Sequence, residues 1–295
     1  MPLLTPILRV AAPSLAFVLT LMLSLGAWAI PTPAGAQRVV VSPAAQAESN
    51  VPKWLRGRPW GITVGYDSAY EGSGELGLTI NLAADYGSAQ AARSPLQSLS
   101  SIDIPVVSQD WLQLGISANL WGDHVSTGPR EGLDYLYPSL AAGVWGSVGV
   151  DSIALDAKIL GKLWSPEIFP TPREGFEGQL GLTLYAPLMR LGGGRALDLA
   201  VRGDVTFADD AYMSQHFGIS ASEAARSGLS AYTAGAGLKS TGLSLGAVVP
   251  LSRNFELQGA AGLVQLLDDA AQSPWVTERG KATDIWGNVG VAFRF

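Results

Sequence analysis

The C-terminal segment of the chain alternates so strictly that few structures can accommodate it. Its last ten residues read WGNVGVAFRF. In a β-strand, successive side chains point to opposite faces. One face therefore carries only apolar residues and glycine, namely Ile285, Gly287, Val289, Val291, Phe293 and Phe295. Because the other face carries Asn288 and Arg294, we expect the apolar face to meet something other than water.

The same two-residue pattern recurs along most of the chain. It is clearest in WGITVGYD, ELGLTINLAADY, WLQLGISANLW and ALDLAVRGDVTF, each about long enough for a tilted strand that crosses a bilayer. Further strands are expected at about 101–107, 137–150, 153–163, 179–188, 237–249, 254–266 and 284–295. Beyond the N-terminal segment, no run of 18 apolar residues occurs, so a mature chain in the membrane must be a barrel.

Composition separates a barrel from a water-soluble β-sandwich, which would also alternate. Only 15% of the residues are charged, against roughly 25% in a typical soluble domain. The polar face of the expected strands consists mainly of Gly, Ala, Ser, Thr and Asn, as in a crowded barrel interior. A formal charge of -6 argues against nucleic-acid binding, which requires a basic face. The pattern predicts an all-β, antiparallel, up-and-down transmembrane β-barrel of the bacterial outer membrane.

The first 36 residues resemble a secretory signal peptide. Arg9 precedes an apolar stretch, and small residues allow cleavage after residue 29 or after residue 36. An uncleaved membrane anchor is the alternative, because the apolar stretch approaches the length of a spanning helix. We expect residues 1–36 to be the signal, 37–56 a mobile lead-in, and 57–295 the barrel of an exported protein.

Loop lengths predict the orientation and the number of strands. The connections 165–177, 209–236 and 267–283 are long and should face outside, whereas short turns should face the periplasm. This reading leaves about eleven strands, although single-chain bacterial barrels have an even number. A strand at 38–42 would give twelve, the number we favour. If the run 101–107 belonged to its neighbour, the number would be ten.

Charged residues fall on the inward face of the expected strands. A buried charge must find a partner or water. The lumen is therefore either cross-linked by ion pairs, which would make a rigid and plugged barrel, or wet, which would make a narrow pore. The residues concerned are Asp85, Asp156, Lys158, Lys162, Asp198, Arg202, Asp204, Glu256 and Arg294.

The region 207–251 is more distinctive than the alternating strands. It reads FADDAYMSQHFGISASEAARSGLSAYTAGAGLKSTGLSLGAVVPL, and the chain also contains LLDDAAQSPWV, the terminal VAFRF and the upstream YEGS. Together these segments resemble the MipA/OmpV family of outer-membrane proteins, the MltA-interacting proteins. Ser220 with Glu223 forms a capping-box pattern, so we expect a short helix within a loop that folds over the outer mouth. Its signature residues are Tyr212, Phe217, Gly218, Ser227 and Tyr232, and the aromatic ones are expected to pack the loop down.

The sequence offers little sign of catalysis. Its two histidines, His124 and His216, lie in expected loops. A set of His216, Ser214 and Asp210 can be written down, yet no nucleophile elbow or zinc-binding helix motif accompanies it. The acidic pairs at 209–210 and 268–269 lack the ligand spacing of a calcium loop. We expect no catalytic residue, metal or cofactor.

The family resemblance implies a non-enzymatic scaffold that holds a murein-degrading lytic transglycosylase close to a murein synthase. The polar lumen suggests an alternative, a porin-like channel for small solutes, and the long loops a third, a surface adhesion or stress-response protein. Phe293 and Phe295 resemble the terminal signal that the barrel-assembly machinery recognises. The expected partners are therefore outer-membrane lipid, this machinery and the two wall enzymes.

Overall fold

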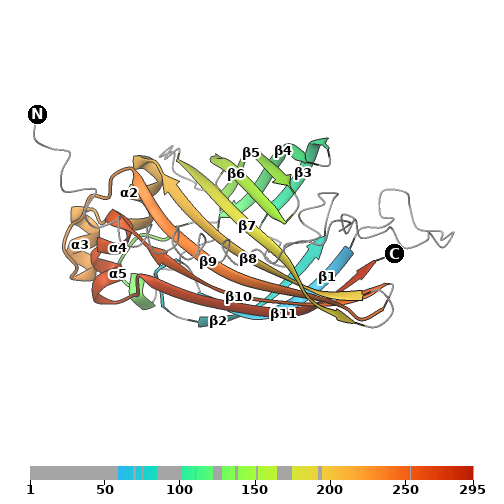
Figure 1. The fold of residues 1–295 in the computed structure, drawn as a ribbon. Helices are drawn as coiled ribbons and strands as arrows, with labels where there is room; N and C mark the ends of the chain where they lie inside the picture. Colours follow the sequence, from blue (N-terminus) through green and yellow to red (C-terminus); the bar gives the residue numbers. More distant parts are fainter. Residues whose placement is uncertain are drawn as a thin grey trace, which may run out of the picture. The chain divides into compact units, whose positions relative to one another are not determined.

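The fold is an antiparallel sheet that carries a group of helices at one end (Figure 1). The computed structural model describes residues 59–68, 71–74, 76–84, 101–109, 111–121, 128–136, 139–150, 152–164, 175–191, 195–252 and 254–294. All of them belong to one unit, Ala47–Phe295. The expected signal peptide and lead-in, the segment 38–42, Asp85, His124 and Phe295 lie outside the described residues.

The described strands are those that the alternation predicts. They are β1 (Pro59–Ser68), β2 (Leu76–Ala84), β3 (Ser101–Ser108), β4 (Leu112–Trp121), β5 (Ser139–Val150), β6 (Ile153–Trp164), β7 (Phe176–Leu191), β8 (Arg195–Ala208), β9 (Gly237–Pro250), β10 (Phe255–Leu266) and β11 (Thr283–Arg294). From β3 to β11 each strand pairs with the next along the chain, and β11 also pairs with β1. Every pairing is antiparallel, which confirms the up-and-down arrangement.

The strand count differs from the even number expected. The sheet has eleven strands in the order β2-β1-β11-β10-β9-β8-β7-β6-β5-β4-β3, and the run 101–108 is a strand of its own rather than part of its neighbour. Because directions alternate along the sheet, the two edge strands β2 and β3 run the same way. They cannot complete the antiparallel alternation by pairing with each other, and within the described residues the barrel does not close.

The two faces of the sheet have the opposite polarity to those of a soluble protein. Large apolar side chains on the outer face are exposed, among them Leu163 at 67% and Ile285 at 66%. The inner face holds buried polar residues from several strands, including Gln113, Ser117, Ser147, Thr183 and Ser244. In β11, Ile285, Val289 and Val291 face out, and Ala292 is buried, as the terminal alternation predicts. An apolar belt of this extent suits contact with lipid.

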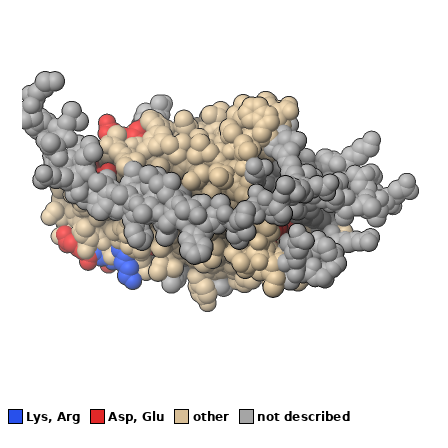
Figure 2. All heavy atoms as spheres, in the orientation of Figure 1, with Lys and Arg blue, Asp and Glu red and all other residues tan. Residues whose placement is uncertain are grey.

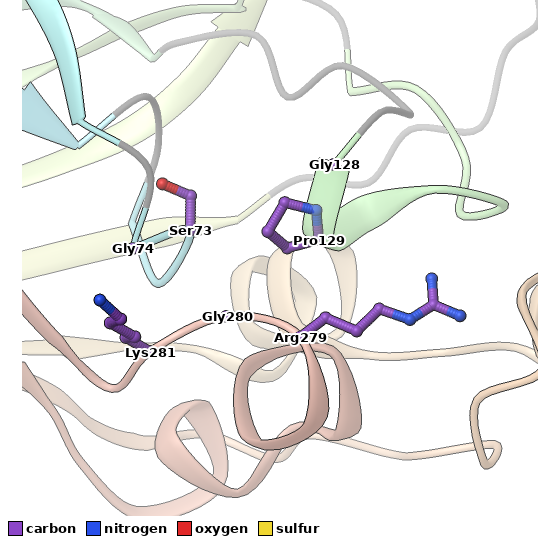
Figure 3. A pocket seen from close by; sticks show the side chains of 7 residues that line it. All are labelled: Ser73, Gly74, Gly128, Pro129, Arg279, Gly280 and Lys281. Carbon is purple, nitrogen blue, oxygen red and sulfur yellow. The ribbon is translucent and has the colours of Figure 1, made fainter.

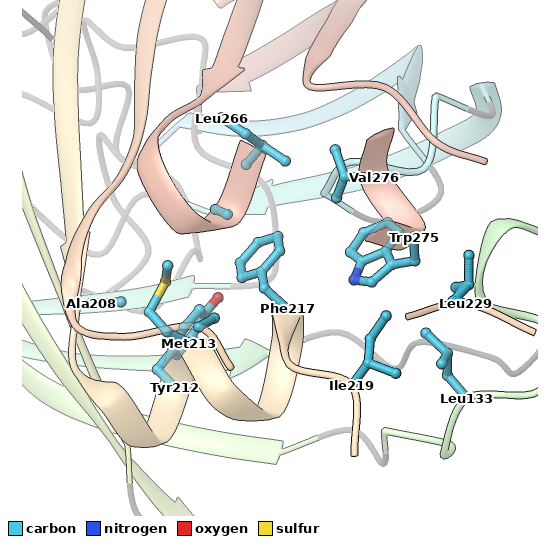
Figure 4. Close-up of a cluster of buried hydrophobic side chains, with 12 residues drawn as sticks. Leu133, Ala208, Tyr212, Met213, Phe217, Ile219, Leu229, Leu266, Trp275 and Val276 are labelled. Carbon is cyan, nitrogen blue, oxygen red and sulfur yellow. The ribbon is translucent and has the colours of Figure 1, made fainter. Parts of the chain in front are cut away.

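The connections at one end of the sheet contain the helices. They are η2 (Gly128–Arg130), α2 (Asp210–Phe217), α3 (Ala221–Ser227), α4 (Asp268–Gln272) and α5 (Pro274–Glu278). Among the described residues, no helix is long and apolar enough to cross a membrane. The main buried hydrophobic cluster lies among these connections and not between sheet layers (Figure 4). We call residues 71–74, 128–136, 209–236 and 267–282 the cap, and the opposite end of the sheet the turn end.

Charge follows the same division along the molecule. On the face shown in Figure 2, the blue and most of the red side chains lie at the end that carries the cap. At the turn end, short connections join β5 to β6, β7 to β8 and β9 to β10. Long connections at one end and short turns at the other are typical of outer-membrane barrels.

Candidate functional site: the cap and the charged lumen beneath it

The cap has a hydrophobic core of its own. Trp275 is 1% exposed and Met213 is fully buried, and the rings of Phe217 and Trp275 stack with centroids 5.9 Å apart. Figure 4 shows Phe217 and Trp275 at the centre of this group. Arg130 also lies over the indole, with its guanidinium carbon 5.2 Å from the ring centroid. Its Nη1 also donates to the carbonyl oxygen of His216 at 2.8 Å.

The structure places the signature residues within this cap. Tyr212 and Phe217 are in its hydrophobic cluster. Half-buried Tyr232 donates its hydroxyl to the carbonyl oxygen of Asp269 at 3.0 Å. Burial and the nearby Asp269 raise the pKa of Tyr232 to about 12. Gly218 follows α2 so closely that a Cβ there would lie 2.4 Å from the carbonyl oxygen of Ser214.

The expected capping box is confirmed at the start of α3. The Ser220 hydroxyl accepts from the Glu223 amide at 3.3 Å, and the Glu223 carboxylate accepts from the Ser220 amide at 2.8 Å. Its second oxygen accepts from the Asp134 amide at 3.0 Å, which ties α3 to the segment after η2. Burial opposes ionisation of Glu223, but the hydrogen bonds from Ser220 and Asp134 outweigh it and lower the pKa of the carboxyl.

Polar contacts join the connections that build the cap. Ser273 donates its hydroxyl to the carbonyl oxygen of Phe217 at 2.6 Å. Arg279 donates to the carbonyl oxygen of Glu131 at 2.9 Å and to that of Ser227. Since these contacts cross between segments far apart in sequence, the cap is one packed body.

A small cavity marks the place where three of these connections meet (Figure 3). It measures about 370 Å³ and is lined by Ser73, Gly74, Gly128, Pro129, Arg279, Gly280 and Lys281. Figure 3 shows that the Arg279 side chain extends away from Lys281. Beside this open pocket the backbones of Gly280 and Gly72 approach closely, since a Cβ on Gly280 would lie 2.1 Å from the carbonyl oxygen of Gly72.

A buried lysine connects the cap to the barrel wall. Lys239, on β9, is 4% exposed. Its Nζ lies 2.9 Å from the carboxylate of Glu71 in the β1–β2 turn and also contacts the carboxylate of Glu177 on β7. The same nitrogen lies 3.4 Å from the Tyr212 hydroxyl and 5.0 Å from the centroid of its ring. One ammonium group therefore joins two wall strands, the turn and α2.

The electrostatics of this cluster are dominated by burial. Burial raises the pKa of the Glu71 carboxyl, and Glu177 and Asp284 push it the same way, whereas Lys239 acts in the opposite direction. Burial also raises the pKa of the Tyr212 hydroxyl well above its ordinary value. The negative charges of Glu71 and Glu177 are thus compensated by the positive charge of Lys239.

The alternation rule missed Lys239. The pairing of β8 with β9 shifts register between Thr206 and Phe207, so that consecutive residues of β9, Lys239, Ser240 and Thr241, are all buried. At such an irregularity the alternation of side chains between the two faces of the sheet is interrupted. The signal that could have found the lysine is its position two residues into a strand that follows a packed loop.

Three of the expected lumen charges come together farther down the wall. Arg202 on β8 makes a bidentate pair with Asp156 on β6, with nitrogen–oxygen distances of 2.5 and 2.9 Å. Its Nε lies 3.6 Å from Asp204. The guanidinium crosses β7 above Gly181, where a Cβ would lie 2.1 Å from Arg202 Nη2. Gln179 adds a hydrogen bond to Asp204 at 3.2 Å.

The other expected lumen charges are spread along the wall. Lys158 and Lys162 are half-buried on β6, and Glu256 is buried on β10, where it accepts from Gln258 at 3.0 Å. Asp198 is exposed near the start of β8. Arg294 is the last residue of β11, and its side chain is outside the description.

The three residues that could be combined into a catalytic set from the sequence alone, Ser214, Asp210 and His216, make structural contacts. Ser214 donates to the carbonyl oxygen of Ala234 at 3.3 Å, and Asp210 accepts from the Ala236 amide at 2.5 Å. The His216 ring stacks on Tyr212 with centroids 4.1 Å apart. Within the described residues, no group of three or more His, Cys, Asp and Glu side chains could hold a metal ion.

The antiparallel sheet, with its apolar outer face, polar inner face and packed cap, defines a protein of the outer-membrane β-barrel class. The chain also matches the family model described as MltA-interacting protein MipA over residues 60–295. It therefore belongs to the MipA family, which confirms the resemblance noted in the sequence.

Solved structures to which the chain is similar include several outer-membrane proteins. Outer-membrane expressed OmpT of Vibrio cholerae has 10% identity and a TM-score of 0.34, with 79% of this chain and 64% of that chain covered. The β-domain of the Bordetella autotransporter Brka has 12% identity and a TM-score of 0.41, with coverage of 80% and 98%. A bacterial polysaccharide outer membrane secretin has 9% identity and a TM-score of 0.40, with coverage of 83% and 100%. The chain thus spans less than two thirds of OmpT. No curated protein matches it.

Proposed function

We propose that this protein is a non-enzymatic scaffold of the outer membrane, which holds a lytic transglycosylase close to a murein synthase at the cell wall. The observation that carries the proposal is membership of the MipA family, whose name states an interaction with MltA. The chain would reach the outer membrane of a Gram-negative bacterium after its signal peptide is removed.

The cap and the lumen support a static role for the barrel. The cap encloses Trp275, Phe217 and Met213 in a buried hydrophobic core at the end expected to face outside. Farther down, the pair of Arg202 and Asp156 ties β6 to β8 across β7. A scaffold needs a rigid body in the membrane and does not need an open pore.

A pull-down tests this proposal. The tagged full-length protein is cross-linked in intact cells and recovered from envelope extract, and another tagged outer-membrane barrel from the same envelope serves as the control. We expect a lytic transglycosylase and a murein synthase to be enriched over the control. Recovery of no wall enzyme above the control level would contradict the scaffold.

A channel is the second candidate, and a specific observation favours it. Within the described residues, the side-chain oxygens of Gln113, Asn119 and Asn288 are buried without a hydrogen-bond partner. All three residues lie on the lumen side of their strands, where water could satisfy them. A hydrated lumen is the first requirement of a solute pathway.

Planar-bilayer conductance separates the two candidates. The refolded mature chain is compared with a variant that lacks residues 210–231, the part of the β8–β9 connection that contains α2 and α3. Stable current steps in the intact protein would favour the channel. Current only after the deletion would mean a capped barrel, and silence in both would support the scaffold alone.

A further inference from the structure

One buried cation is among the contacts that join the cap to the wall, beside backbone hydrogen bonds such as Leu267 N to Lys239 O and the packing of Ala208 and Leu266 in the cap core. Lys239 Nζ contacts Glu71 in the cap, Glu177 on the wall and Tyr212 in the cap. Of the other ion pairs, those of Arg202 with Asp156 and Asp204 lie within the wall, and that of Arg226 with Asp134 lies within the cap. Lys239 is thus a buried electrostatic contact between the cap and the wall.

The β1–β2 turn presents Glu71 to this cation. Gly72 donates its amide to the Asp284 carboxylate at 2.8 Å, and its carbonyl oxygen accepts from the Lys281 amide at 2.9 Å. The turn is therefore held between β11 and the segment after α5. Its acidic residue points at β9, three steps away along the sheet order.

The charge balance at this point is unequal. Two carboxylates contact one ammonium group, and Asp284 lies close enough to Glu71 to disfavour its ionisation. Without the ammonium, the carboxylates of Glu71 and Glu177 would lie near each other in a buried site with no compensating charge. Removing one partner of a buried ion pair is costly because the remaining charge is left uncompensated.

We propose that the cap is a lid latched by Lys239, and that loss of the charge on this residue, by leaving the carboxylates of Glu71 and Glu177 uncompensated, releases the cap from the barrel wall and opens the lumen at the cap end. The lumen ion pair of Arg202 and Asp156 lies within the wall and does not include a cap residue, so it can persist when the cap moves. The proposal does not depend on the scaffold, because it concerns the junction and not a protein partner.

Cysteine labelling tests the latch, because the chain contains no cysteine. Ala270, on α4, is fully buried in the cap core and accepts a cysteine with little change in volume. In the Ala270→Cys background, we compare maleimide labelling of the refolded, full mature chain with and without Lys239→Met. We expect labelling about tenfold faster with Lys239→Met, since breaking the junction raises the population of the open cap. Ser230→Cys, which is exposed, gives the reference rate.

Matched variants separate charge from packing. Lys158→Met removes a half-buried lysine from the lumen side of β6 and should leave the labelling rate unchanged. Lys239→Met combined with Glu71→Gln and Glu177→Gln removes the uncompensated carboxylates and should restore protection. Glu71→Lys alters only the turn, leaves the wall intact, and should open the cap as Lys239→Met does.

The outcomes decide the proposal. Each variant is first shown to be assembled by its heat-dependent shift on a gel, and conductance is recorded in parallel. Current steps together with fast labelling in Lys239→Met and Glu71→Lys are expected. If both variants assemble and stay protected and silent, the latch is wrong. Fast labelling of the triple variant would also overturn it, because the lysine would then act through packing. If Lys239→Met does not assemble, Glu71→Lys alone decides by the same criteria.

Discussion

Gly72 is the point at which the cap leaves no room for a side chain. Its φ of +81° is a conformation that other residues rarely adopt. A Cβ there would lie 2.9 Å from the Trp275 ring and 3.0 Å from Leu266. Both the backbone and the packing of the cap core therefore require glycine. Gly228, after α3, has a similar φ of +77°, but nothing lies within 4 Å of a Cβ built on it.

Substitutions at Gly72 and Gly228 separate the contribution of backbone conformation from the contribution of packing. We expect Gly228→Ala to lower the free energy of unfolding of the cap by about 1 kcal/mol through backbone strain alone. Gly72→Ala should cost about 1–3 kcal/mol more, because the methyl group overpacks the core. Denaturant unfolding followed by tryptophan fluorescence measures both. Equal losses of unfolding free energy in the two variants would show that the side chains around residue 72 rearrange to accommodate the methyl group.

The lowered pKa of Glu223 makes its contribution depend on pH. Its ionised form is favoured in the folded cap relative to the ordinary value of 4.5. The stabilisation is therefore fully present above that value and is lost as the pH falls through the lowered pKa. Glu223→Ala should destabilise the cap by about 1 kcal/mol at about pH 7 and by much less at about pH 3. Unfolding titrations at both pH values check this, and a loss that is the same at both would contradict it.

At the scale of elements, Gly181 lets β6 and β8 be joined across the strand between them. The Arg202 guanidinium passes over this glycine to reach Asp156. The alternation in the sequence predicts that these charges face the lumen, but it does not show that Arg202 pairs with Asp156 two strands away. The register of β7 decides that, since it sets Gly181 opposite both Asp156 and Asp204.

Arg202 and Asp156 should be energetically coupled. We expect Arg202→Met to lower the free energy of unfolding by about 1–3 kcal/mol, because it leaves a carboxylate without its partner. Adding Asp156→Asn should recover part of that loss, so the double variant is more stable than the sum of the single effects implies. Lys158→Met is the control for loss of a lumen cation. Strictly additive effects would mean that the pair is not coupled.

The terminal strand carries a prediction about assembly. The outer face of β11 is apolar, and the sequence extends that face to Phe295. We expect Phe295→Asp to reduce the fraction of assembled, heat-modifiable barrel strongly, because a charge on this face opposes lipid and the terminal signal is lost. Arg294→Asp alters the opposite face of the same strand and is the matched control. Unchanged assembly of Phe295→Asp would refute the assigned signal.

For the whole molecule, the sheet could be predicted from the sequence and the cap only in part. Lipid on one side and a polar lumen on the other impose a period of two, so the strands from β1 to β11 could be recognised one by one. Helix α3 could be foreseen because Ser220 and Glu223 signal it locally. The packing of Arg130 on Trp275 and the contacts of Lys239 join distant segments, and no local pattern encodes them.

The cap has a further consequence for how the protein is made. Its parts come from four connections, and the contact between Gly72 and Asp284 spans 212 residues of sequence. Contacts between such distant segments form late, since closing long loops costs entropy before any contact compensates for it. The cap can therefore be complete only after β11, the last strand, has paired with β1 and has brought Asp284 to the amide of Gly72.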